Sequence, residues 1–131
     1  ISLIAKLKDV FTISKPHNVH IDIMRIDWKR VYTTNYDDLI EMSARQNSRR
    51  VESRDVDATT EFFPNDRFCV HLNGYIQNLN EEYINSKFKL SHSSYVAPDE
   101  FLKSNWNYIF KKDLETSSAI VFVGYSLYDI D

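Results

Sequence analysis

Glycine is scarce in this chain, since only two of its 131 residues, Gly74 and Gly124, are glycine. An average protein contains about 7% glycine. A P-loop and a complete dinucleotide-binding fingerprint each need two or three glycines within a few residues, so neither lies in this stretch. Collagen-like, linker-like and low-complexity sequences are excluded by the same scarcity.

Cysteine is scarcer still. The single cysteine, Cys69, excludes an internal disulfide and any zinc cluster that takes two or four cysteines from this chain. No apolar run approaches the roughly 18–20 residues of a membrane span, and no signal peptide opens the sequence. These features predict a reducing, cytoplasmic location without membrane contact.

Positive charge is not in excess, because 16 Lys and Arg face 19 Asp and Glu, for a net charge of −3. Non-specific nucleic-acid binding depends on a basic surface, so we expect no direct nucleic-acid contact. The 43% hydrophobic and 27% charged content predicts a globular domain. The chain begins without methionine and stops just after an apolar run, so we expect residues 1–131 to be a single domain fragment, truncated at both ends.

Apolar spacing and β-branched runs predict the elements of the chain. We expect helices over residues 1–11, from Asp37 onward, over 80–86 and over 98–114, and strands over 30–34, 51–56, 68–72 and 119–123. Residues 20–26 fit a strand and a helix equally well. The continuously apolar run 119–123 is typical of a central parallel strand that is covered on both faces.

Strands that alternate with helices predict an α/β fold with a doubly wound, mostly parallel sheet. Ligands of such sheets bind outside the carboxyl ends of the strands. Polar residues follow three of the predicted strands, in the segments TTNYD (33–37), HLNG (71–74) and GYSLYD (124–129). The sequence therefore predicts a site built from these three segments.

The first segment supports two interpretations. Asn and Asp are common in turns and at helix N-termini, so on spacing alone Asn35 and Asp37 are best explained as turn and cap residues. The alternative is that both side chains point into the crevice at a ligand.

The second and third segments also allow more than one interpretation. His71 and Asn73 are two residues apart on a predicted strand, so their side chains share one face. His71 is explained equally well as a buried structural residue and as a catalyst. Gly124 suits a sharp turn, and Ser126 offers a hydroxyl to a sugar or phosphate. A serine nucleophile elbow is excluded because Tyr128 stands where its second glycine is required.

Two further groups of residues do not predict a site. Several His and Asp side chains lack the spacing of metal ligands, so no metal is expected; they are His17, His20, Asp22, His71 and His92. Four arginines within ten residues indicate a solvated loop face, with phosphate contact as the alternative; they are Arg45, Arg49, Arg50 and Arg54.

Taken in order, five segments resemble the sirtuin-like domains of bacterial anti-phage defence proteins. They are WKRVYTTNYDDLIE, VHLNGYI, KLSHSSYV, a Trp-bearing helix and IVFVGYSLYD, and they span residues 28–131. The resemblance implies a Rossmann-like domain that binds NAD and cleaves its nicotinamide–ribose bond. It also implies that the first βα unit, with the glycine-rich turn for the pyrophosphate, lies upstream of Ile1.

The resemblance assigns catalytic roles to three residues. Asn35 takes the place of the asparagine that contacts the nicotinamide ribose and orients water, and Asp37 that of the neighbouring aspartate, which supports the developing positive charge. The family pattern Leu-His-Gly reads Leu72-Asn73-Gly74 here, so His71 would have to supply the base from two residues earlier. The remaining cofactor-binding residues implied are Thr33, Thr34, Asn73, Gly74, Gly124, Ser126 and Leu127.

The function implied is that of an NAD hydrolase that stops phage by depleting NAD, in the manner of abortive infection. NAD is then the substrate, no zinc is expected, and the partners are further copies of the chain and a defence ATPase or a phage trigger protein. An NAD-dependent protein deacylase is an alternative, weakened because sirtuin deacylases hold zinc with four cysteines. A non-catalytic sensor of NAD or ADP-ribose, or an assembly module, is the other, and Asn73 at the usual histidine position keeps it open.

Overall fold

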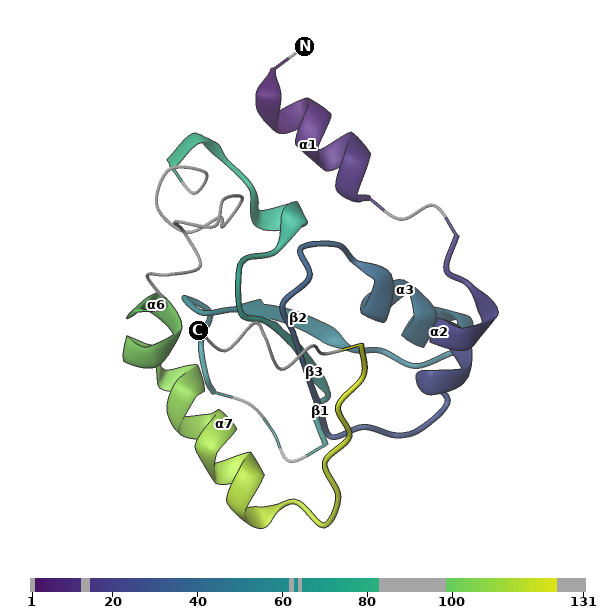
Figure 1. The fold of residues 1–131 in the computed structure, drawn as a ribbon, viewed down its shortest axis with the longest axis vertical. Coiled ribbons are helices and arrows are strands. Elements are labelled where there is room, and N and C mark those ends of the chain that lie inside the picture. Colours follow the sequence, from purple (N-terminus) through teal and green to yellow (C-terminus); the bar gives the residue numbers. More distant parts are fainter. Residues whose placement is uncertain (1, 13–14, 62, 64, 83–98, 125–131) are drawn as a thin grey trace.

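The structure is a computed structural model that describes residues 2–12, 15–61, 63, 65–82 and 99–124. Three parallel strands form one sheet in the order β1-β3-β2, with helices on both faces (Figure 1). The strands are β1 (Arg30–Thr33), β2 (Glu52–Asp55) and β3 (Phe68–His71). The helices are α1 (Leu3–Phe11), α2 (Asn18–Ile23), α3 (Leu39–Gln46), the 3₁₀ turn η1 (Ile76–Asn78), α6 (Asp99–Lys103) and α7 (Asn105–Thr116).

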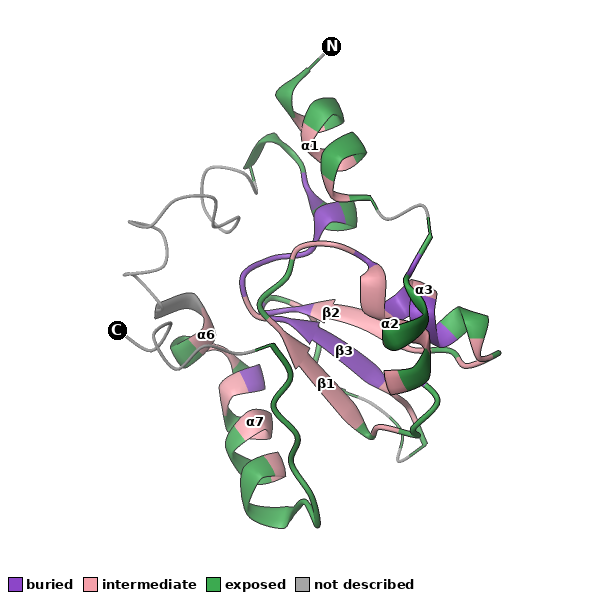
Figure 2. Ribbon diagram, turned by 45° about the vertical axis from the view of Figure 1, so that its right-hand side comes forward, coloured by how far each residue is buried: buried purple, intermediate pink, exposed green. Residues whose placement is uncertain are grey.

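The central strand β3 sends alternate side chains to the two faces of the sheet, and all four of its residues are buried (Figure 2). Phe68 and Val70 pack against Trp106 of α7, with the Phe68 and Trp106 rings edge to face at 5.9 Å. Trp106 also donates its indole N–H to the carbonyl of Ala58 at 3.0 Å. This apolar layer holds α7 against one face of the sheet.

The opposite face of β3 carries polar side chains. Cys69 and His71 point toward α3, where Glu41 and Ala44 are buried. The short helix α2 is joined to α3 by Asn47, whose side-chain amide donates to the carbonyl of Ile21 at 2.8 Å. One face of the sheet is therefore an apolar core, and the other contains a small polar interior.

A second apolar cluster lies beyond the carboxyl ends of the strands. Tyr75, Ile76 and Leu79 are buried there, and the apolar side of α1 packs on them together with Tyr36. The helix α1 begins after Ser2, whose hydroxyl accepts a hydrogen bond from the amide of Ala5 at 3.2 Å. The helix predicted over residues 1–11 is thus confirmed, apart from residue 1, which lies outside the described residues.

The strands predicted over 30–34, 51–56 and 68–72 and the helix predicted from Asp37 onward are confirmed, each with slightly different ends. The ambiguous segment 20–26 contributes to a helix, α2. The helix predicted over 98–114 is interrupted at Ser104, whose extended backbone separates α6 from α7, and residue 98 lies outside the described residues. Of the helix predicted over 80–86, residues 81 and 82 are helical and 83–86 lie outside the described residues.

The strand predicted over 119–123 is wrong. These residues pair with no described strand, and Phe122 and Val123 are 73% and 63% exposed. The chain reverses after α7 and runs back toward the sheet as irregular backbone (Figures 1 and 2). An apolar run favours burial, but a strand also needs a neighbour for its backbone hydrogen bonds, and no described strand pairs with this one.

None of the helices in the described part of the chain has the length and apolar character needed to cross a membrane.

Candidate active site

Two loops leave β1 and β3 at the same edge of the sheet and are joined by hydrogen bonds. Four consecutive backbone carbonyls, those of residues 33–36, each accept one hydrogen bond from residues 71–76. The Leu72 amide donates to the carbonyl of Thr33 at 2.9 Å, and the Asn73 side-chain amide donates to that of Thr34 at 3.3 Å. His71 Nδ1 donates to the carbonyl of Asn35 at 2.8 Å, and the Ile76 amide donates to that of Tyr36 at 2.8 Å. The structure therefore brings two of the predicted site segments, TTNYD and HLNG, into one unit.

The outer surface of this unit presents polar side chains. Thr34 and Asn35 are exposed, while their carbonyl groups are bound to the neighbouring loop. The hydroxyl of Thr33 accepts the amide N–H of Asn35 at 3.1 Å, which tightens the turn. The backbone of Asn35 is thus fixed, while its side chain lies at the carboxyl end of β1.

Asp37 has the cap role that its spacing in the sequence favours. Its Oδ1 accepts the amide N–H of Leu39 at 3.1 Å, as a cap on the first turn of α3. Asp37 is also half-buried, and this burial raises the pKa of its carboxyl above 3.8, because it outweighs the Leu39 hydrogen bond and the attraction of His71. The Asp37 carboxyl, two residues from Asn35, is therefore easier to protonate than a solvated aspartate.

His71 is completely buried, and both of its ring nitrogens have partners. Nδ1 donates to the carbonyl of Asn35 at 2.8 Å, and Nε2 lies 2.7 Å from Oε1 of Glu41. The ring of Tyr75 covers it at 4.4 Å between centroids. Neither nitrogen is available to a ligand. His71 therefore has no free nitrogen with which to act as the base at the ribose.

Glu41, which the sequence did not predict as a site residue, lies beneath this loop pair. Its side chain is 2% exposed, and Oε1 also accepts the hydroxyl of Ser53 at 2.7 Å. Burial alone would raise the pKa of the Glu41 carboxyl, but the hydrogen bond and charge of His71, helped by Ser53, lower it below 4.5. Glu41 is therefore an ionised carboxylate in the polar interior.

Cys69 completes a group of three potential metal ligands. Its Sγ lies 3.6 Å from His71 Nε2, and the ligand atoms of Glu41, Cys69 and His71 lie within 4.8 Å of one another. Burial raises the pKa of the Cys69 thiol well above its ordinary value, which keeps it protonated. Ligand atoms on a tetrahedral zinc are about 3.3 Å apart, whereas Glu41 and His71 meet at 2.7 Å. The three residues fit a hydrogen-bonded cluster better than a metal centre.

Among the remaining predicted cofactor-binding residues, Asn73 and Gly74 lie in the joined loops, whereas Gly124 does not. Asn73 is 8% exposed with its amide on the Thr34 carbonyl, and Gly74 has φ 113°, in the region that favours glycine. Gly124 also has a positive φ of 63°, but it is exposed, and a Cβ there would meet nothing within 4 Å. Ser126 and Leu127 lie outside the described residues, so the third segment is not placed at the site.

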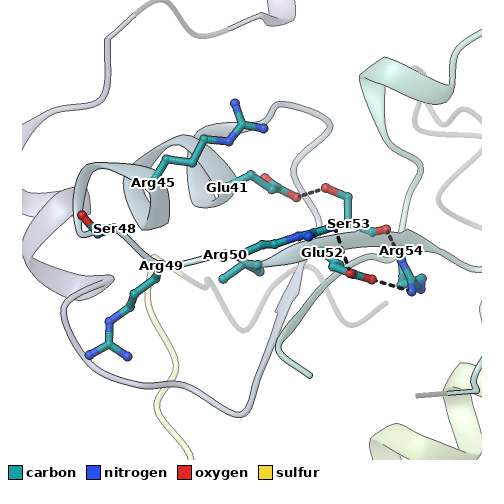
Figure 3. Close-up of a pocket in the computed structure, with 9 residues that line it drawn as sticks. Glu41, Arg45, Ser48, Arg49, Arg50, Glu52, Ser53 and Arg54 are labelled. Carbon is teal, nitrogen blue, oxygen red and sulfur yellow. Dashed lines mark hydrogen bonds and ion pairs between the residues drawn. The ribbon is translucent and has the colours of Figure 1, made fainter. Parts of the chain in front are cut away.

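The arginine-rich segment borders a separate pocket of about 720 Å³ between α3 and β2 (Figure 3). Arg49 pairs with Asp27 at 3.0 Å, and Arg54 pairs with Glu52 at 2.8 Å. These ion pairs favour the interpretation as a solvated charged face. Glu41 and Ser53 also line this pocket and point toward each other in Figure 3.

The parallel strands, the helices on both faces and the joined loops at the strand ends define a partial Rossmann-like α/β domain. The chain belongs to the SIR2-like domain family, because the model of that family matches residues 29–131. The family uses NAD, and the match covers nearly the same residues as the resemblance seen in the sequence. Among curated proteins, none matches this chain.

Proposed function

We propose that this SIR2-like domain hydrolyses NAD at the nicotinamide–ribose bond and serves a bacterial anti-phage defence protein that acts by NAD depletion. The observation that carries the proposal is the joined loop pair. It fixes the backbone of Asn35 while leaving the side chain exposed, two residues from a carboxyl whose pKa burial raises.

The reaction consumes NAD and water and yields ADP-ribose, nicotinamide and a proton. Nicotinamide is bound in NAD as a cationic pyridinium and leaves as a neutral molecule, so its departure needs no general acid. The enzyme has to stabilise an oxocarbenium-like ribose and to orient a water molecule. In our proposal the Asn35 amide orients that water, and the Asp37 carboxylate accepts its proton and supports the positive charge.

His71 then acts through Asn35 and not on the substrate. Its Nδ1–H holds the Asn35 carbonyl, and its other nitrogen is bound to Glu41. Asn73 holds the neighbouring carbonyl of Thr34 in the same way. Both polar side chains of the HLNG segment therefore shape the loop that carries the catalytic residues.

The test measures NAD loss and nicotinamide release by the full-length protein. We expect Asn35→Ala to lower kcat by about a hundredfold, the effect of removing one well-placed polar group from an active site. Asn18→Ala is the matched control, because Asn18 is an exposed asparagine of α2 and lies outside the joined loops. Undiminished turnover in Asn35→Ala would refute the assignment of Asn35.

The same samples separate the alternatives. Acetyl-ADP-ribose formed from NAD and an acetylated peptide would identify a deacylase and overturn the hydrolase proposal. Binding of NAD without turnover under every trigger tried would identify a sensor or assembly module. The only cysteine of these 131 residues is buried against His71, so this stretch supplies no thiolate to a four-cysteine zinc cluster.

A further inference from the structure

The polar interior under the Asn35 loop contains an unusually direct chain of contacts. Glu41 Oε1 is 2.7 Å from His71 Nε2, and His71 Nδ1 is 2.8 Å from the carbonyl oxygen of Asn35. The side chains of Glu41 and His71 are 2% and 0% exposed, so water does not compete for these bonds. Three residues from α3, β3 and the loop after β1 are thus linked in series.

The chemistry of the partners fixes the protonation of the imidazole. A backbone carbonyl only accepts hydrogen bonds, so Nδ1 must carry a proton. Glu41 Oε1 already accepts the Ser53 hydroxyl and so meets Nε2 as an acceptor, which requires a proton on Nε2 as well. Two donating nitrogens correspond to an imidazolium, with a carboxylate within hydrogen-bonding distance to balance its charge.

The other groups around the pair favour the same charge state. The Asp37 carboxylate, at the start of α3, attracts His71 electrostatically, and Asp38 lies next to it. Burial keeps the Cys69 thiol and the Tyr75 hydroxyl protonated by raising their pKa values, so neither adds a charge. The Ser53 hydroxyl, from β2, donates to Glu41. The Ser53 hydrogen bond stabilises a negative Glu41, and the neighbouring carboxylates favour a positive His71.

We propose that Glu41 is a positioning residue of the NAD site, whose carboxylate holds His71 as an imidazolium so that Nδ1–H fixes the carbonyl of Asn35. The inference rests on the proposed hydrolysis for its kinetic consequence, but not for the charge state of His71. Glu41 and His71 do not touch the substrate in this scheme. Their effect is to keep the Asn35 side chain where it orients water.

Two variants of Glu41 separate charge from shape in the full-length protein. Glu41→Ala removes both the charge and the hydrogen bond, and we expect kcat to fall about tenfold to a hundredfold with little change in KM, as for a misplaced catalytic group. Glu41→Gln keeps the shape and leaves a neutral His71 that still donates from Nδ1, so its kcat is expected between Ala and wild type. Glu115→Ala and Glu115→Gln are controls, since Glu115 is exposed on α7.

The charge state is read directly from ¹⁵N-histidine NMR at pH 7, with the His71 signals assigned through His71→Asn. We expect two protonated ring nitrogens in the wild type and one in Glu41→Gln. A single protonated nitrogen in the wild type, or a folded Glu41→Ala with wild-type kcat, would overturn the inference. A wild-type protein that hydrolyses no NAD but shows the imidazolium would refute the proposed function and leave the Glu41–His71 pair standing.

Discussion

Arg30 at the start of β1 and Asp113 on α7 form a two-pronged ion pair between elements that are 83 residues apart in the sequence. The second prong, from the Arg30 terminal nitrogen to Oδ1, measures 2.9 Å, and the hydroxyl of Tyr32 donates to Oδ2 at 2.7 Å. The side chains of Arg30 and Asp113 are 6% and 15% exposed. This contact fixes α7 along the edge of the sheet and leads to the first prediction.

Replacing Asp113 by Asn should lower the free energy of unfolding by about 3 kcal/mol at neutral pH, because it leaves the Arg30 charge buried without its partner. Burial would raise the pKa of Asp113, but the hydrogen bonds from Arg30 and Tyr32 lower it below 3.8. The stabilisation is therefore complete above the ordinary carboxyl pKa and is lost as the pH falls through the lowered one.

Thermal unfolding at neutral pH and at about pH 3 checks this dependence on Asp113. The difference between wild type and Asp113→Asn should shrink at the acidic pH. Asp9→Asn, on the exposed side of α1, is the control and should be neutral at both. An equal difference at the two pH values would contradict the assignment.

The second prediction concerns the apolar face. Trp106 is completely buried against Phe68 and donates to the Ala58 carbonyl. Trp106→Ala should cost about 3–5 kcal/mol in urea unfolding, and Trp106→Phe less, because only part of the volume and the hydrogen bond are lost. Trp28→Phe is the matched control, since the Trp28 indole also donates to a carbonyl but lies at a partly exposed position. A larger loss in Trp28→Phe than in Trp106→Phe would place the core elsewhere.

The third prediction is a pH dependence. Because burial raises the pKa of Asp37, kcat/KM for NAD should fall as the pH drops through a value above 3.8 and the carboxylate is protonated. Asp37→Asn should lower kcat and abolish this acidic limb, which steady-state kinetics from about pH 4 to 8 would reveal. Asp9→Asn should keep the wild-type profile. An unchanged limb in Asp37→Asn would assign the proton transfer to another group.

The fourth prediction tests the joined loops. Asn73→Ala removes the donor to the Thr34 carbonyl, so it should lower stability by about 1 kcal/mol and reduce kcat severalfold by loosening the turn before Asn35. Thermal unfolding and NAD turnover measure the two effects. Gln77→Ala, an exposed change in η1, is the control. Full activity in Asn73→Ala would show that this hydrogen bond does not hold the catalytic loop.

Much of the sheet was predictable because its signals are local. The β-branched and aromatic residues 30–34 and the apolar run 68–72 indicated strands, and the polar residues after each strand indicated a site at the carboxyl edge. The meeting of TTNYD with HLNG follows from parallel pairing, which places Thr33 beside His71. The sequence therefore predicted the fold class and the meeting of two of the three polar segments.

The unpredicted parts depend on contacts between distant residues. Glu41 has an ordinary helical context, and only its 2.7 Å contact with a residue 30 positions later distinguishes it from a solvated glutamate. His71 looked like a base because a sequence does not reveal that both of its nitrogens are already bound. The apolar run 119–123 predicts a strand because an apolar pattern measures the tendency to be buried, while strand pairing depends on a neighbour.

The alternation of β3 also limits how this domain can vary. Phe68 and Val70 face the apolar layer, while Cys69 and His71 face the polar interior. Deletion or insertion of one residue in this strand would exchange the two sets, placing the His71 ring against Trp106 and an aromatic ring against Glu41. Changes in the length of β3 therefore disturb both faces of the sheet at once, and homologues should keep the number of residues in this strand.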